Sequence, residues 1–490
     1  MESFTRDRLQ AIFVSANRWV VALAVVASCL LAGLALGWLI AYLNPLLTTA
    51  LIAAIVLGLL MLRDLRWCFF ALVGVICLLP FAAIPLNIGF SPTLLDLVLG
   101  VTFLVWFSRV VTGQEEEFIP TPLALPLSIF IILALASFVA GLAHASLSAR
   151  VLRRFAETLM GIALFFVAVN SIRRRKQLEQ VILLIILAGF AAALVGVVLY
   201  FLPRELTVRL LSALGRFDYP TGWSVLRFIR DDSQLPMRAT STSIDPNALG
   251  GMLILVISLA TTQLFAPHPL IRRKWLAPML AMMVLCLFLT YSRGSMIGLG
   301  VGLLFLGIAK YRRLLLVLVL AGLLVLSLPQ AQGYIEHFLA GVRGQDLATR
   351  MRLGEYKDAF ILIRRYPWIG VGFAGTPDID LYIGVSSLYL LIAEEMGLVG
   401  LACFLVIVGI FFVYTGKAWR RMIPTPHLEP LLLGLQAALV SGLTGGILDH
   451  YLFSFRHAVA FFWLFMGLGM AAARMGSSGD RSGAPLHSES

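Results

Sequence analysis

Charged side chains are scarce in this chain, and their scarcity excludes a soluble protein. Asp, Glu, Lys and Arg make up only 13% of its 490 residues, whereas 60% are hydrophobic. A soluble protein of this length could not bury so much apolar surface. Apolar runs of about 17–25 residues recur along the chain, and this length crosses the hydrocarbon core of a bilayer. The composition therefore predicts an all-α, polytopic membrane protein with a single membrane domain over residues 1–490.

Cysteine and cofactor motifs are also lacking. The five cysteines are scattered in or beside apolar segments, with neither metal-site spacing nor a disulfide framework. The sequence contains no paired His/Cys ligand motif, no Asp-x-Asp cluster, no Walker loop and no dinucleotide fingerprint. We therefore expect no metal and no cofactor, and the energy for any reaction should come from the substrate. The net charge is +12, but no run of basic residues is interleaved with aromatic residues. We therefore expect no nucleic acid partner.

Hydropathy predicts about fourteen membrane-spanning helices. Prolines fall mostly near the ends of the apolar segments, as expected for residues that terminate helices. The first apolar segment has no evident cleavage site and is predicted to be retained as an anchor. The predicted spans are 19–42, 45–62, 67–86, 92–111, 122–142, 151–170, 179–202, 246–266, 275–291, 294–309, 313–329, 387–415, 429–448 and 455–474.

The basic loops predict the orientation of these spans, because cytoplasmic loops carry an excess of Lys and Arg. With the amino terminus in the cytoplasm, the basic clusters at 63–66, 173–176, 272–274, 310–313 and 417–421 all fall inside. The Gly/Ser-rich segment 475–490 is then predicted to be a disordered cytoplasmic tail. Two long connections, 203–245 and 330–386, fall outside, and long connections in a compact fold are usually functional.

Several arginines fall on the outer side, which should be poor in positive charge. Positive charge on this side opposes the predicted orientation, so another factor should favour it. The simplest explanation is that these arginines bind an anionic substrate such as a lipid-linked phosphate or pyrophosphate. Three further arginines within 150–154 also fall outside. Either the span count is wrong there, or these arginines belong to the same anion-binding site. The five main residues are Arg238, Arg293, Arg343, Arg350 and Arg352.

The first candidate motif ends the 203–245 segment. Asp245 is predicted to cap a helix that begins at Pro246, followed by Asn247. A helix amino terminus presents free N–H groups that suit phosphate, and Arg238 could add a bidentate contact. Ordinary helix capping plus a surface arginine is the alternative interpretation.

The second motif is Tyr291-Ser292-Arg293, which lies between two spans with almost no loop. The tight turn puts Arg293 at the membrane interface, where a buried guanidinium is costly unless paired. The alternative is an arginine that extends to lipid headgroups.

The third motif is an amphipathic helix predicted over 349–363. Arg350 and Asp358 lie two turns apart and so share a face, with Arg352 nearby. A solvated helix with ordinary ion pairs is the alternative for most of these residues.

Two further motifs supply carboxylates. Tyr389 lies at the start of an apolar segment that contains Glu394 and Glu395. Burying two carboxylates in a membrane helix costs free energy unless they face protein, water or cations. Asp449-His450 lies at the last outer turn and could act as a base. A structural salt bridge and an interfacial polar turn are the respective alternatives.

Taken in order, these motifs resemble the O-antigen ligase and O-antigen polymerase superfamily of bacterial membrane glycosyltransferases. The matching segments run from Arg238 to the turn at 449–451 and include the 367–372 stretch Pro-Trp-Ile-Gly-Val-Gly. The resemblance implies an all-helical GT-C type fold in the inner membrane and a periplasmic active site, while the basic loops and the span count predict that both termini are cytoplasmic. It also implies an undecaprenyl-diphosphate-linked oligosaccharide donor held by arginines, a glycan or lipid-linked acceptor, contact with membrane lipid, and no metal. A chain-length regulator protein is a further partner that the resemblance admits.

The sequence departs from the family pattern at Ser386-Ser387, where ligases of this family commonly carry His-Asn. Serine is a poor base at neutral pH, so a polymerase is favoured over a ligase that transfers to lipid A core or protein. A transporter or an inactive scaffold remains a rival from another class, although the charges gather near outer ends and not at a midplane path. The expected catalytic residues are Arg238, Arg293, Glu395, Asp449 and His450. The expected substrate-binding residues are Asn247, Tyr291, Ser292, Arg343, Arg350, Arg352, Tyr389 and Glu394.

Overall fold

The computed structural model describes most of the chain. The described residues are 26, 30, 33, 34, 37, 45–84, 91–113, 118–144, 146–229, 232–327, 347–375, 385–422 and 426–479. Two compact units make up the protein, Met1–Trp67 and Cys68–Ser490. Of the described residues, 79% are helical, and they contain a single two-stranded sheet, in which Arg227 pairs with Arg238. The prediction of an all-α protein is therefore confirmed.

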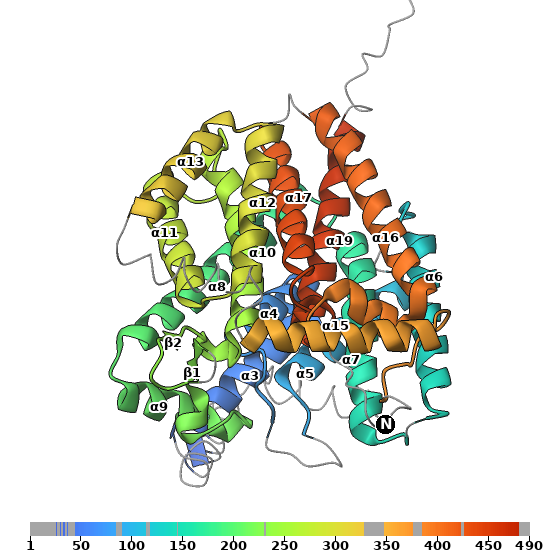
Figure 1. Cartoon of the computed structure of the whole chain (residues 1–490), viewed down its shortest axis with the longest axis horizontal. Coiled ribbons are helices and arrows are strands. Elements are labelled where there is room, and N and C mark those ends of the chain that lie inside the picture. Colours follow the sequence, from blue (N-terminus) through green and yellow to red (C-terminus); the bar gives the residue numbers. More distant parts are fainter. Residues whose placement is uncertain are drawn as a thin grey trace, which may run out of the picture. The chain divides into compact units, whose positions relative to one another are not determined.

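Each predicted span from residue 45 onward coincides with a helix (Figure 1). The span predicted at 19–42 lies mostly outside the described residues, and helix α4 ends at Leu78, before its predicted limit at 86. The helices are α3 Pro45–Arg63, α4 Leu65–Leu78, α5 Leu94–Val111, α6 Ala124–Gly141, α7 Ala149–Ser171, α8 Arg175–Phe201, α9 Arg204–Ser212, α10 Pro246–Phe265, α11 Arg273–Leu289, α12 Arg293–Ala309, α13 Arg312–Ser327, α15 Leu347–Arg365, α16 Leu388–Met422, α17 Leu428–Gly445, α18 Tyr451–Ser454 and α19 Arg456–Gly479.

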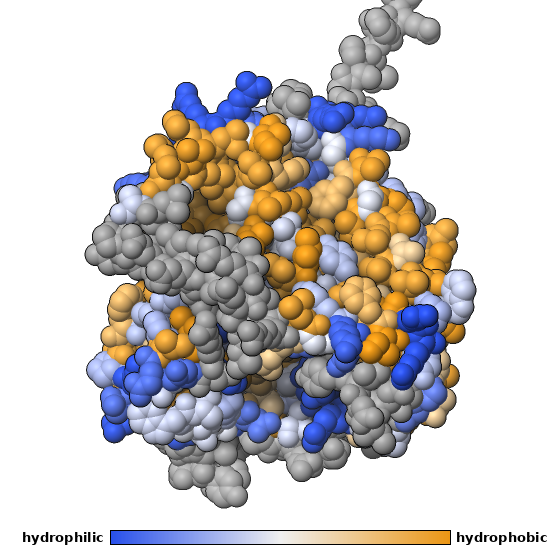
Figure 2. Space-filling model, viewed as in Figure 1, coloured by the Kyte–Doolittle hydropathy of each residue, from blue (hydrophilic) through white to orange (hydrophobic). Residues whose placement is uncertain are grey.

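Seven of the helices in the described part are long and apolar enough to cross a membrane: α5, α6, α8, α10, α16, α17 and α19. Three shorter apolar helical segments lie at Ile52–Arg63, Leu65–Leu78 and Arg293–Ala309. Figure 2 shows hydrophobic residues gathered over α11, α13 and α16, with exposed side chains such as Val284, Leu320 and Leu405. This apolar surface suits lipid, because a soluble monomer rarely exposes so much of it. The structure thus supports a polytopic membrane protein.

Small residues bring α10, α12 and α17 into close contact. Gly294, Gly298 and Gly302 lie one turn apart on α12, and a Cβ at Gly298 would approach Ser441 O of α17 to 2.5 Å. Such glycine stripes allow helix backbones to pack closely inside a membrane. The hydroxyls of Ser258 on α10 and Ser441 are 2.7 Å apart and add a buried hydrogen bond. The three helices therefore form a tight unit whose ends are fixed relative to one another.

The basic connections gather at one end of this helical unit. Glu429 at the start of α17 pairs with Lys310 after α12 and accepts a 2.7 Å hydrogen bond from Trp419 near the end of α16. The rings of His268 and His427 stack at 4.5 Å beside them. The predicted cytoplasmic clusters 272–274, 310–313 and 417–421 are thus at the same end.

The two outer segments of the prediction are folded at the opposite end. Segment 203–245 contains α9, the 3-10 helices Ala213–Phe217, Gly222–Val225 and Ser241–Ser243, and the strands β1 Arg227–Phe228 and β2 Met237–Arg238. From the second segment, α15 runs crosswise to α10, α12 and α17 (Figure 1). The rest of that segment, 330–346 and 376–384, lies outside the described residues.

Candidate functional site

The amino terminus of α10 is capped as predicted. The Asp245 carboxylate accepts hydrogen bonds from the backbone N–H groups of Asn247 (2.8 Å) and Ala248 (2.9 Å), and Pro246 is the first helical residue. An aspartate cap followed by proline is a strong helix start, because proline needs no N–H partner there.

Arg238 connects this helix start to the end of α11. Its Nε donates to Thr290 O and its Nη2 donates to Asn247 Oδ1, both at 2.7 Å. The neighbouring Ala239 N donates to Leu289 O at 2.8 Å. The guanidinium is therefore held in one orientation by the two elements that it joins, as a binding group should be.

Strained backbone surrounds the same place. Ser241, Ile244 and Tyr291 have positive φ angles of 52°, 60° and 53°. Such angles are unfavourable for residues other than glycine, and most of all for a β-branched residue such as Ile244. Strain of this kind persists only where the surrounding structure imposes it, and it clusters at functional sites.

Arg293 is the first residue of α12, directly after the predicted tight turn. Ser292 is the cap residue, and its hydroxyl donates to Ser295 Oγ at 2.9 Å. A Cβ at Gly294 would lie 3.2 Å from Leu448 Cβ, so this first turn packs against the chain just before Asp449. The second motif and the last outer turn are thus brought together.

Asp449 is a buried carboxylate at the centre of this arrangement, with 7% of its surface exposed. Its Oδ1 accepts a 2.9 Å hydrogen bond from His450 N, and its backbone O accepts one from Leu388 N at 3.0 Å. Burial raises the pKa of Asp449; the charges of His450 and Arg352 lower it and that of Asp245 raises it. Residues from α10, α15 and the α17–α18 turn therefore act on one carboxylate.

Helix α15 confirms the amphipathic helix predicted at 349–363 and is attached to the start of α16. Glu355 Oε2 accepts hydrogen bonds from Ser386 N (3.0 Å) and Ser386 Oγ (2.6 Å), and Tyr356 Oη donates to Ser386 O at 3.2 Å. Arg352 lies one turn before these residues on α15, and its charge acts on Asp449. Arg350 belongs to α15, but its side chain lies outside the described residues, and so does the whole of Arg343.

The α16 residues chosen from sequence lie in the first part of that helix, before the non-helical residue Gly397. Tyr389 Oη donates to Leu443 O at 2.9 Å. Val371 N and Gly372 N donate to the backbone oxygens of Glu394 (2.8 Å) and Glu395 (3.0 Å), so the 367–372 loop is fastened there. Seven residues of helix separate Glu395 from Leu388, about 10 Å along the axis. These carboxylates are therefore farther from the Arg238–Arg293 end than Asp449 is.

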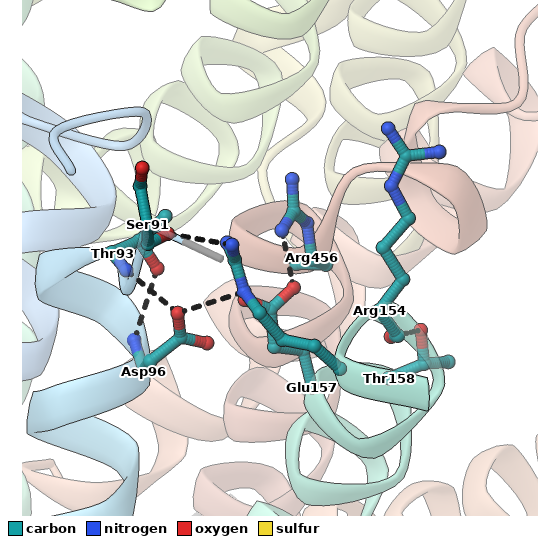
Figure 3. A network of polar contacts seen from close by, with 8 residues as sticks. Ser91, Thr93, Asp96, Arg154, Glu157, Thr158 and Arg456 are labelled. Atoms are coloured by element: carbon teal, nitrogen blue, oxygen red, sulfur yellow. Dashed lines mark hydrogen bonds and ion pairs between the residues drawn. The ribbon is translucent and has the colours of Figure 1, made fainter. Parts of the chain in front are cut away.

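A second polar cluster, formed across α5, α7 and α19, was not anticipated from the sequence (Figure 3). Arg153 Nε lies 3.1 Å from Asp96 Oδ2 and 3.0 Å from Glu157 Oε1, and Arg456 pairs with the other oxygen of Glu157. Arg153 Nη1 also donates to Ser91 O at 2.6 Å. The sequence did contain one signal for this cluster: Glu157 lies inside a predicted span, four residues after Arg153.

This second cluster lies at the same end of the molecule as Asp449. Arg456 follows the short helix α18, which His450 precedes. At the other end of α19, Arg474 donates to Val169 O and Ile172 O at the end of α7, beside the basic residues 173–176. The arginines at 153–154 therefore lie at the same end as Asp449, which is the end predicted to be the outer one.

Together the site offers cations and a buried carboxylate, Asp449. Two helix amino termini carry partial positive charge, and Arg238, Arg293 and Arg352 add full charges, which suits a diphosphate. Within the described residues, no group of three or more His, Cys, Asp or Glu side chains could hold a metal ion.

Comparison with known proteins agrees with this chemistry. Residues 278–405 match the family model described as O-antigen ligase. The matched segment contains Arg293, Arg352 and Ser386, whereas Arg238 and Asp449 lie on either side of it. No curated protein matches the chain. The matched segment supports a relationship to the O-antigen ligase and polymerase superfamily and indicates a function of the ligase or polymerase type on lipid-linked glycans in the membrane.

Proposed function

We propose that this protein is a glycan polymerase of the bacterial inner membrane. It transfers glycan from an undecaprenyl-diphosphate-linked oligosaccharide to a hydroxyl of an acceptor glycan at the periplasmic face, in the assembly of O-antigen or another surface polysaccharide. The observation that carries this proposal is the meeting of the α10 and α12 amino termini with buried Asp449, at the end of the helices opposite the basic connections.

The donor diphosphate is bound by the cations of this end. Arg238 is oriented by Thr290 and Asn247, and Arg293 begins α12, where the helix dipole also favours an anion. As the bond from the anomeric carbon to the diphosphate oxygen breaks, negative charge develops on the leaving diphosphate. Preorganised guanidinium groups stabilise that charge without reorganising, which is the largest contribution in many enzymes. The reaction then needs neither metal nor ATP.

Asp449 is the preferred proton acceptor. The acceptor hydroxyl oxygen forms a bond to the anomeric carbon from the face opposite the diphosphate, which inverts the configuration, and its proton passes to the carboxylate. Burial raises the pKa of Asp449 toward the range in which a carboxylate is an effective base. His450 is adjacent, and its Nδ1 lies 2.6 Å from Ser454 Oγ. Glu395 is disfavoured as the base because it lies about two helical turns along α16 from Leu388, the residue that contacts Asp449.

Ligation to lipid A core or to protein is the second candidate, because the matched family model is described as O-antigen ligase. The polymerase is preferred because Ser386 occupies the position at which a ligase would carry a histidine. The Ser386 hydroxyl already donates to Glu355 at 2.6 Å, so it is part of the α15–α16 attachment.

The test replaces Arg293 by alanine and measures polymer length and membrane content in cells. We expect polymer to be lost while the protein remains in the membrane, because one donor to a developing oxyanion is worth about 100- to 1,000-fold in rate. Arg209→Ala is the matched control, since Arg209 is an exposed arginine on α9 of the 203–245 segment. Polymer of normal length in the Arg293→Ala strain would refute the assignment.

A further inference from the structure

A cavity in the described part lies beside the proposed transfer site and not in it. Its volume is about 370 Å³, which is within the usual range of ligand pockets. Side chains from α5, α7, α18 and α19 meet around it. Its polar lining consists of Thr93, Arg154, Thr158, Ser454 and Arg456.

Positive charge is in excess around this cavity. Three arginines, Arg153, Arg154 and Arg456, stand against two carboxylates, Asp96 and Glu157. Both carboxylates are taken by Arg153 and Arg456, and among the described residues no carboxylate pairs with Arg154. In Figure 3 the Arg154 guanidinium extends away from the carboxylates of Asp96 and Glu157. The cluster therefore keeps one net positive charge, carried by a side chain on the cavity wall.

Part of the cavity wall is aromatic. The rings of Phe81 and His457 meet edge to face at 4.9 Å, and those of Phe455 and His457 stack at 5.8 Å, and all three line the cavity. Flat aromatic faces next to guanidinium and hydroxyl groups suit a sugar ring that carries an anion. The Thr158 hydroxyl donates to Arg154 O at 3.0 Å, so its oxygen remains an acceptor for a sugar hydroxyl.

Helix α18 connects the cavity to Asp449. His450 immediately precedes this four-residue helix, and its last residue, Ser454, lines the cavity. Four helical residues span about 6 Å. A sugar bound in the cavity would therefore present a hydroxyl, or its neighbouring sugar, close to the proposed base.

We propose that this cavity is the acceptor subsite and that it selects an acidic sugar, whose carboxylate or phosphate binds Arg154 while its ring packs on Phe81 and Phe455. The proposal depends on the transfer reaction proposed above for its role, but the binding itself can be tested without any transfer. A polymerase needs separate places for donor and acceptor, and the cations of this cavity are distinct from Arg238 and Arg293.

The binding experiment uses the full-length protein in detergent with glucuronate, glucose 1-phosphate and glucose as probes. We expect the two anionic sugars to bind more tightly than glucose, and Arg154→Ala to weaken them by about 10- to 100-fold, as for loss of a charge-assisted contact. Arg150→Ala is the matched control, because Arg150 is exposed one turn earlier on α7 and does not line the cavity. Arg293→Ala should bind the probes normally, which separates this site from the transfer site.

Several results would overturn the proposal. One is equal binding of glucose and glucuronate, and another is unchanged glucuronate binding in Arg154→Ala. A third is Arg154-dependent binding of phosphatidylglycerol nanodiscs, but not phosphatidylcholine nanodiscs, with no binding of either anionic sugar; the ligand would then be a lipid headgroup. Where transfer is measurable, Arg154→Ala should raise KM for a water-soluble acidic acceptor and leave KM for the lipid-linked donor unchanged. The reverse pattern would assign the cavity to the donor diphosphate.

Discussion

Replacement of Arg238 by lysine tests whether the arginine acts through its shape as well as its charge. In the structure its Nε and Nη2 are held at 2.7 Å by Thr290 O and Asn247 Oδ1. A lysine keeps the positive charge, but a single ammonium cannot satisfy both partners and also offer a planar edge to a diphosphate. The variant should therefore lose at least one hydrogen bond to the donor.

The magnitude follows from the value of such bonds. A hydrogen bond to a charged group is worth about 1.5–3 kcal/mol, and each 1.36 kcal/mol changes a rate about tenfold. Arg238→Lys should thus lower kcat/KM by about 10- to 150-fold. Arg238→Ala should lower it further, because it removes the charge as well.

The assay is transfer from a lipid-diphosphate-linked oligosaccharide by purified variants, with melting temperature measured in parallel. Asn247→Ala removes one of the two groups that orient Arg238, so its effect should be largely absent in the Arg238→Lys background, where the orientation is already lost. Arg209→Ala should behave like the wild type. The reasoning is refuted if Arg238→Lys retains kcat/KM within about threefold of wild type, or if Arg238→Lys and Asn247→Ala combine additively.

Three other predictions address packing, the base and the absence of a metal. Gly251→Ala should destabilise the protein by about 1–3 kcal/mol, since a Cβ there would lie 2.0 Å from Tyr451 Cε2, whereas Gly300→Ala should be neutral because nothing lies within 4 Å; equal melting temperatures for the two would contradict this packing. If Asp449 is the base, activity should fall as the pH drops through its pKa; because the Arg352 charge lowers that pKa, Arg352→Ala should move the acidic limb of the pH–rate profile to higher pH, and a shift to lower pH would contradict it. EDTA should leave the transfer activity unchanged. Loss of activity with EDTA, followed by recovery when a divalent cation is added, would disprove the metal-independent mechanism.

Local sequence chemistry was sufficient to predict the parts of the site that depend on neighbours in the chain. The cap at Asp245 followed from its position before Pro246, and the first turn of α12 at Arg293 followed from two apolar runs with almost no loop between them. The helix at 349–363 followed from its periodicity and is part of α15. In each case the physical signal is contained within a few residues.

The contacts between distant segments could not be predicted in this way. Ser386 gave no sign that Glu355 would bind it from 31 residues away, and the Asp96–Arg153–Glu157–Arg456 cluster joins three helices. The choice of Glu394 and Glu395 shows the same limitation. A carboxylate in an apolar helix signals a special environment, but the sequence does not show that the backbone oxygens of these residues fasten the 367–372 loop. Their catalytic role stays a prediction with less geometric support than that of Asp449.

The most direct test of the central claim is reconstitution of the purified protein with a lipid-diphosphate-linked oligosaccharide alone, without metal or ATP, followed by gel analysis of the glycans. The account predicts a ladder of longer lipid-linked glycans for the wild type and none for Arg293→Ala. Transfer that occurs only after lipid A core or a protein acceptor is added would contradict the polymerase and identify a ligase. Absence of both products from correctly folded protein would contradict glycan transfer at this site.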